Sequence, residues 1–111
     1  MNWIPLTEEI QLQKINEQSV AQPVIIFKHS TRCNISAMAM NRLERETAPE
    51  EALFYYLDLI RYRNISNKIA SDYSVHHQSP QVLLIKNGEC IYEETHNGID
   101  MADIASQIKF N

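Results

Sequence analysis

The sequence predicts an α/β domain in which helices flank a mixed sheet of about four strands. Residues 24–27 and 53–58 are short runs rich in β-branched and aromatic residues, as in strands buried on both faces. The segment between them is long enough for a helical crossover, so the two strands should be parallel. Asn87-Gly88 separates two later apolar runs and predicts a hairpin, because both central residues of its turn need positive φ.

The first half of the chain alternates predicted helices with these buried strands. Thr7 is a candidate N-cap for a helix that extends to about Gln18 along a thin apolar stripe. After the first strand, Ser30 or Thr31 should cap a second helix that ends near Glu46. Four apolar residues of this second helix are expected to face the core: Ile35, Met38, Ala39 and Leu43.

The second half should add a helix, the hairpin and a closing helix. Asn64 is a candidate cap for a helix over residues 65–73, and the hairpin strands should cover residues 82–85 and 90–95. Asp100 is a candidate cap for the last helix, whose apolar residues recur at i, i+3, i+4 and i+7.

Composition and charge are those of a soluble globular protein. The 111 residues suit a single domain over residues 1–111, with 44% apolar and 22% charged residues. The net charge of -4 argues against nucleic acid as the main partner, because phosphate binding needs a basic face. Residues 1–5 lack the basic flank and apolar run of a signal peptide or membrane span. A cytoplasmic location without a membrane partner is therefore expected.

The two cysteines differ in their surroundings. A reducing cytosol disfavours a structural disulfide between Cys33 and Cys90, so two free thiols are expected. Cys33 lies near the start of the second predicted helix, where free backbone N–H groups favour the nucleophilic thiolate. Cys90 opens the alternating run of a predicted strand and is interpreted as structural.

Three segments occur together in the order found in thioredoxin-like domains. A cysteine at a helix start is followed by serine three positions later, a Ser-Pro pair directly precedes a strand, and an Asn-Gly hairpin follows. The segments are Thr31-Arg32-Cys33-Asn34-Ile35-Ser36, Val75-His76-His77-Gln78-Ser79-Pro80-Gln81 and Leu84-Ile85-Lys86-Asn87-Gly88. Through them nearly the whole chain resembles the monothiol bacilliredoxin family of bacterial cytosolic proteins, which implies a thioredoxin-like fold.

The resemblance implies thiol–disulfide exchange with Cys33 as the only nucleophile. Its thiolate would attack a disulfide sulfur and form a mixed disulfide. Position 36 holds serine where a dithiol site has its resolving cysteine, so a low-molecular-weight thiol, bacillithiol or a similar one, is expected to resolve the intermediate. The implied partners are S-thiolated client proteins and that thiol as co-substrate, without a tightly bound cofactor.

The expected site extends beyond the cysteine. Ser36 would donate a hydrogen bond to the Cys33 sulfur across one helical turn, although an ordinary polar helix position is an equal alternative. Arg32 would add positive charge beside the thiol. By the resemblance, Ser79-Pro80 would form a cis-proline loop whose backbone holds an extended ligand. The predicted thiol-binding residues are Thr31, Gln78, Ser79 and Pro80.

Other polar residues near these motifs are interpreted as structural or solvated. Lys28 is expected at a solvated strand end, although it could also reach the surface beside Cys33. The same two positions stay open for His29. The adjacent pair His76-His77 should point to opposite sides of an extended segment, so no shared metal ion is expected; contact of one ring with the proline loop is the alternative. Arg61 and Arg63 follow a strand end where ligands bind α/β sheets, but solvated positions are favoured.

Two other functions stay open. Monothiol proteins of the glutaredoxin type can hold an iron–sulfur cluster between two subunits, and a brown protein would indicate such a carrier. Against this, Cys33-Asn34-Ile35-Ser36 does not match the Cys-Gly-Phe-Ser motif of those carriers. A non-catalytic interaction module with an incidental thiol is the third reading. Residues 96–100 also lack the aromatic residue expected beside the last helix, which leaves the identity of the small thiol open.

Overall fold

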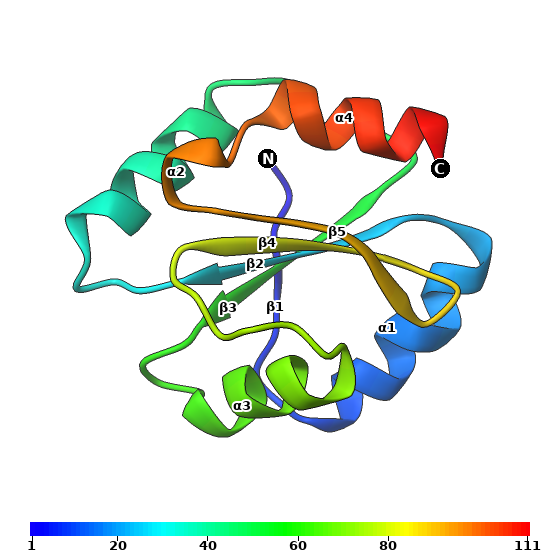
Figure 1. Ribbon diagram of the computed structural model, residues 1–111, viewed down its shortest axis with the longest axis horizontal. Coiled ribbons are helices and arrows are strands. Elements are labelled where there is room, and N and C mark those ends of the chain that lie inside the picture. The colour runs from blue at the N-terminus through cyan, green and yellow to red at the C-terminus, as the bar shows by residue number, and fades with distance from the viewer.

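A five-stranded mixed sheet lies between two pairs of helices in the computed structural model, which describes residues 1–111 (Figure 1). The strands are β1 (Ile4–Pro5), β2 (Val24–His29), β3 (Leu53–Asp58), β4 (Gln81–Lys86) and β5 (Glu89–Thr95). The helices are α1 (Ile10–Ala21), α2 (Asn34–Glu44), α3 (Arg63–Asp72), the short 3₁₀ helix η1 (His96–Gly98) and α4 (Met101–Phe110). The strand order is β1-β3-β2-β4-β5, with β1, β3 and β2 parallel and the β4–β5 hairpin antiparallel.

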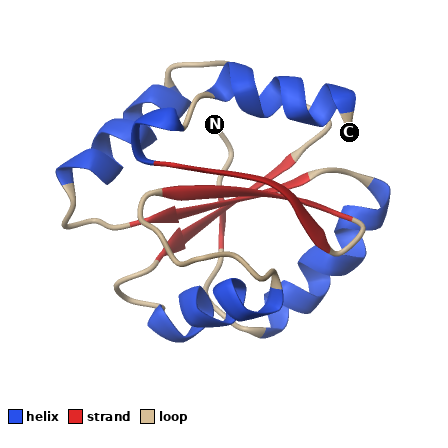
Figure 2. Cartoon of the chain, in the orientation of Figure 1, coloured by secondary structure: helices blue, strands red, loops and turns tan.

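β2 is the central strand of this sheet, and all six of its residues are buried. Its side chains alternate between the two faces. Val24 and Ile26 pack into the hydrophobic cluster on the side of α1 and α3. Ile25 and Phe27 pack into the cluster on the side of α2 and α4. The two helix pairs are seen on opposite sides of the sheet in Figure 2.

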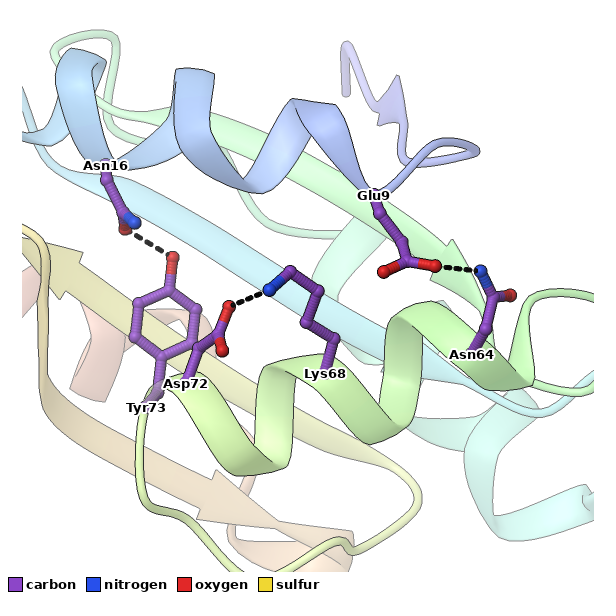
Figure 3. Close-up of polar contacts among 6 residues, drawn as sticks. All are labelled: Glu9, Asn16, Asn64, Lys68, Asp72 and Tyr73. Carbon is purple, nitrogen blue, oxygen red and sulfur yellow. Dashed lines mark hydrogen bonds and ion pairs between the residues drawn. The ribbon is translucent and has the colours of Figure 1, made fainter.

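Polar contacts fix α1 beside α3 (Figure 3). Tyr73 Oη donates a hydrogen bond to Asn16 Oδ1 at 2.6 Å, and Asn64 Nδ2 donates to a carboxylate oxygen of Glu9 at 2.8 Å. The two contacts lie at opposite ends of α3, so they hold the helix along its length. None of the helices is both long and apolar enough to cross a membrane.

The predicted α/β class and the parallel and hairpin pairings are confirmed, but the sheet has one strand more than expected. The fifth strand, β1, has two residues and pairs with β3 through Ile4 and Tyr55. Two residues are too few to give a recognisable alternation in the sequence. β1 therefore depends on the edge of β3, which offers it unpaired backbone groups.

Two predicted helix caps are wrong. α1 begins at Ile10 with Glu9 in the N-cap position, because the Thr7 amide instead donates to the side chain of Gln11 at 2.7 Å. α3 begins at Arg63 rather than after Asn64, whose side chain contacts α1 as described above. At α1 the side chain of Gln11, inside the helix, accepts from the Thr7 amide, and at α3 the side chain of Asn64 contacts the N-cap residue of α1.

The start of α2 also differs from the prediction. Ser30 and Thr31 lie in a turn, and Cys33 itself occupies the N-cap position of α2. The Cys33 amide donates to the Ser30 carbonyl at 3.2 Å, which closes this turn before the helix begins. Asp100 occupies the N-cap position of α4 as predicted, but its side chain makes no capping hydrogen bond.

The buried face of α2 is rotated from the predicted one. Met38 is 58% exposed and Ile35 is 44% exposed, so the prediction that they face the core is wrong. The buried residues are Ser36, Ala39 and Leu43, at i, i+3 and i+7. The polar Ser36 thus lies on the inner face, where the sequence pattern favoured its apolar neighbours.

Substitutions within α2 should report this rotation. Leu43→Ala should lower the free energy of unfolding by about 2–5 kcal/mol, because it leaves a cavity in the core. Met38→Ala should change it by less than about 0.5 kcal/mol, because its side chain is largely in solvent. Urea unfolding of the two variants measures the difference, and equal losses would contradict the assigned face.

Candidate active site

Two loops that carry predicted site residues emerge at the same end of the sheet. The turn that follows β2 leads to Cys33, and the loop that precedes β4 contains Ser79 and Pro80. β2 and β4 are antiparallel neighbours in which Lys28 pairs with Gln81. The end of one strand therefore lies beside the start of the other, and the two loops meet there (Figure 1).

Cys33 is placed at the N-cap of α2 with extended backbone angles, φ -113° and ψ 122°. Its side chain is partly exposed and makes no capping hydrogen bond. The first amides of a helix have no intrahelical acceptor, and an N-cap side chain lies where it can accept from them. Cys33 is therefore placed at the positive end of the dipole of α2.

Ser36 does not make the predicted contact with the Cys33 sulfur. It is fully buried, and its Oγ lies 2.6 Å from His29 Nδ1 and accepts a hydrogen bond from the Ser30 amide at 3.0 Å. The hydroxyl points toward the sheet because β2 ends directly beneath the first turn of α2. The serine of the Cys-x-x-Ser motif is therefore joined to the sheet.

The loop before β4 is ordered by hydrogen bonds on both sides. The Ser79–Pro80 peptide bond is cis, and the Pro80 carbonyl accepts a hydrogen bond from the His96 amide at 3.1 Å. Ser79 Oγ is buried and has no hydrogen-bond partner in the protein. A buried hydroxyl without a partner is unusual, and here it belongs to the loop expected to face the thiol.

The remaining predicted residues lie on the surface of the same end. Thr31 and Arg32 are exposed in the turn before Cys33, and Gln78 is exposed in the loop before Ser79. The two loops bring these residues to the same end of the sheet, although no side-chain hydrogen bond joins them. Arg61 and Arg63 are also exposed, as expected for solvated positions.

The interpretation of Lys28 as a solvated strand end is wrong. Its side chain is fully buried, and its Nζ lies 2.9 Å from Nδ1 of His77, which also lies 3.2 Å from Ser66 Oγ. Burial lowers the pKa of Lys28 to about 8. Burial and the nearby charges of Lys28 and Arg63 lower the pKa of His77. This contact links the loop before Ser79 to the central strand.

Lys28 was expected in solvent and His29 was left open, because the strand was expected to end at Phe27; alternation continued for two more residues would have buried both. Arg42 was not predicted at all. Arg42 holds η1 beside α2 by donating to the carbonyls of His96 and Ile99 at 3.0–3.2 Å. No local pattern marks it, because its partners are more than fifty residues away.

Cys90 is too distant to act with Cys33 in one chain. It pairs with Ile85, which pairs with Val24 at the start of β2, whereas Cys33 follows the end of β2. Six strand residues span on the order of 16 Å. A disulfide needs Cα atoms within about 7 Å. Burial also raises the pKa of the Cys90 thiol, whose Sγ donates to the Tyr92 carbonyl.

No group of three or more His, Cys, Asp or Glu side chains is arranged to hold a metal ion. His76 is exposed and its carbonyl, rather than its ring, accepts a hydrogen bond from Gln81. The His77 ring contacts Lys28 on β2 and Ser66 on α3, and not the proline loop that was given above as the alternative to chelation.

The buried charge of Lys28 should be visible in unfolding. Lys28→Met should raise the free energy of unfolding at pH 7 by about 3 kcal/mol, since each pH unit by which the pKa is lowered corresponds to about 1.4 kcal/mol. Between pH 8 and 10.5 the unfolded chain holds a proton that the folded protein has lost, so the wild type gains stability with rising pH. Urea unfolding at pH 7, 8.5 and 9.5 should therefore show that the difference in free energy of unfolding between Lys28→Met and the wild type becomes smaller as the pH rises.

Lys14→Met is the matched control, because Lys14 is exposed on α1 and its replacement should leave stability nearly unchanged at every pH. A gap between Lys28→Met and the wild type that stays constant with pH would contradict the buried charge.

The family model described as monothiol bacilliredoxin BrxC matches residues 4–104 of this chain. A solved structure described as a candidate oxidoreductase with a thioredoxin fold is 30% identical, with a TM-score of 0.81, over 93% of this chain and 90% of its own. The thioredoxin of Malassezia sympodialis is 18% identical, with a TM-score of 0.72, over 97% of this chain and 89% of its own. That of Fasciola hepatica is 17% identical, with a TM-score of 0.70, over 95% of each chain. The two thioredoxins show the fold alone.

These matches confirm the resemblance drawn from the three motifs, and they agree with a thiol-redox role. The family model spans all five strands of the sheet and ends within α4. The chain has a thioredoxin fold and belongs to the monothiol bacilliredoxin family.

Proposed function

We propose that this protein is a monothiol thiol–disulfide oxidoreductase that removes bacillithiol from S-thiolated client proteins. The observation that carries the proposal is the position of Cys33, a partly exposed thiol at the N-cap of α2 with no second thiol within bridging distance. Family membership supports bacillithiol as the small thiol. The cytosol is the proposed location, because its reducing poise keeps such a thiol free.

The first step transfers the small thiol to the protein. The Cys33 thiolate attacks the bacillithiol sulfur of the client mixed disulfide, a new S–S bond forms, and the client leaves as a thiolate. The client is thereby reduced and Cys33 is oxidised to a mixed disulfide. The amides of the first turn of α2 lie beside the sulfur and favour the attacking thiolate.

The second step must use a thiol from outside the chain. Ser36 has no sulfur to offer, and Cys90 lies at the opposite end of β2. A second molecule of bacillithiol, as its thiolate, attacks the adduct, forms bacillithiol disulfide and releases the Cys33 thiolate. Over the full cycle one disulfide replaces another: the client sulfur is reduced to a thiol, and the incoming bacillithiol is oxidised into bacillithiol disulfide.

The groups around Cys33 suit a small polar thiol. The hydroxyl of Ser79 is buried without a protein partner and can donate to a ligand oxygen. Arg32 is exposed next to the thiol and can pair with a ligand carboxylate, while Thr31 and Gln78 line the two loops. The backbone beside Pro80 can hold an extended ligand.

Intact mass spectrometry tests the transfer. The reduced protein is mixed with a client carrying bacillithiol and, separately, with the same client carrying glutathione. The wild type should gain a single bacillithiol adduct, and Cys33→Ser should gain none, because position 33 carries the only nucleophile of the site. Transfer from the bacillithiol client at a rate at least about tenfold above the glutathione client would identify the preferred thiol.

Cys90→Ser is the matched control and should accept the adduct as the wild type does. Equal labelling of Cys33→Ser and the wild type would contradict the assignment of Cys33. Absence of an adduct from either client would remove the enzymatic proposal and favour a carrier or an interaction module.

A further inference from the structure

His29 is the last residue of β2 and lies buried beneath the first turn of α2. It is 7% exposed, and the rings of Phe27 and Tyr56 lie beside it with centroid distances of 5.6 and 5.5 Å. These contacts hold the imidazole so that its Nδ1 lies 2.6 Å from Ser36 Oγ. A titratable ring is therefore in hydrogen-bond contact with the serine of the Cys-x-x-Ser motif.

The hydroxyl of Ser36 has one proton to donate and two lone pairs. The Ser30 amide occupies one lone pair at 3.0 Å. When His29 Nδ1 carries no proton, the Ser36 hydroxyl donates to it, and the second lone pair can accept from another donor. When Nδ1 carries a proton, the ring donates to Ser36, and the hydroxyl proton is free to point elsewhere.

Cys33 and Ser36 both belong to the first turn of α2, where Cys33 is the N-cap and Ser36 is the third residue of the helix. No hydrogen bond joins their side chains in this structure, in which Ser36 Oγ contacts His29 and the Ser30 amide. Catalytic hydrogen bonds often form only in the complex with substrate, and the partly exposed Cys33 side chain can turn toward Ser36. The contact between the Cys33 sulfur and Ser36 Oγ is therefore part of the inference.

We infer that His29 accepts the Cys33 proton through Ser36. The thiol gives its proton to Ser36 Oγ as the Ser36 hydroxyl proton passes to His29 Nδ1. The products are a Cys33 thiolate that accepts from Ser36 and an imidazolium that donates to Ser36. No proton leaves the protein and its net charge does not change. The inference rests on the proposed function and assigns His29 as a positioning residue of that site.

The surroundings of His29 suit this exchange. Burial lowers the pKa of His29, whereas the Asp58 carboxylate on β3 and the Glu44 carboxylate on α2 act in the opposite direction. The phenol of Tyr56 faces the ring from β3, and burial together with these carboxylates raises the pKa of Tyr56. Burial thus favours the neutral ring, which can accept a proton, and the two carboxylates stabilise the imidazolium once it forms.

The rate of alkylation by iodoacetamide, measured from pH 5 to 9 in a Cys90→Ser background, tests the relay. His29→Asn places an amide near the position of Nδ1, so it can bond to Ser36 but cannot take up a proton. We expect its alkylation rate at pH 6 to be about tenfold lower than that of the parent, as for a one-unit displacement of the rate profile. Ser36→Ala should cause a similar loss, and the double variant should lose no more than either single variant.

His76→Asn is the matched control, because His76 is exposed on the loop before β4 and does not contact Ser36. Its rate profile should overlay that of the parent. A His29→Asn profile that keeps the shape and position of the parent profile would overturn the relay, since a purely structural histidine would not set the pH dependence of the thiol.

NMR titration of the His29 ring gives a second readout that does not depend on a His29 variant folding. Two coupled groups titrate in two steps. The ring should therefore show two steps in the Cys90→Ser protein and one step after Cys33→Ser is added. Identical titration curves in the two proteins would also overturn the relay.

The transfer assay with bacillithiol-modified client separates this inference from the proposed function. Transfer by the wild type together with an unchanged His29→Asn alkylation profile would reject the relay alone. A displaced profile without transfer from any client would support the relay and reject the proposed substrate.

Discussion

The alternation of side chains along β2 is the constraint on which the site depends. Because successive residues face opposite sides of the sheet, Lys28 points toward α3 and contacts His77, whereas His29 points toward α2 and contacts Ser36. The end of β2 thus contacts both loops of the site from opposite faces of the sheet: Lys28 contacts the loop before β4, and His29 contacts the first turn of α2. A shift of one residue in the register with β3 and β4 would exchange the two side chains and leave each facing the wrong loop.

The serine at position 36 is part of the buried structure. In a dithiol site this position supplies the second sulfur, but here the side chain is fully buried and has hydrogen-bond partners on two sides, the Ser30 amide and His29. Its hydroxyl secures the turn that places Cys33 at the N-cap of α2. Replacing it with a thiol would exchange these bonds for weaker ones, since sulfur is a poor donor and acceptor. The monothiol site is therefore built around its hydroxyl.

The sequence predicted the elements well where local patterns decide them. The buried composition of β2 and β3 and the Asn87-Gly88 turn gave the pairings, and the turn residues have the positive φ that the prediction required. The prediction failed where contacts with residues distant in sequence decide which side chains are buried. The rotation of α2 follows from the contact of Ser36 with β2, and the burial of Lys28 follows from His77, forty-nine residues away. The contact of Ser36 with β2 leaves no local signature, so Met38 was assigned to the wrong face; Lys28 was assigned to solvent because the strand was ended at Phe27.

Basic side chains hold the loops around Cys33 through neutral partners. Lys28 meets an imidazole nitrogen, and Arg42 donates to the carbonyls of His96 and Ile99, so neither basic group is neutralised by a carboxylate. The ion pair in the structure, Lys68 with Asp72, lies within α3. The arrangement of these two loops therefore depends on buried or half-buried basic groups that use neutral acceptors in place of carboxylates.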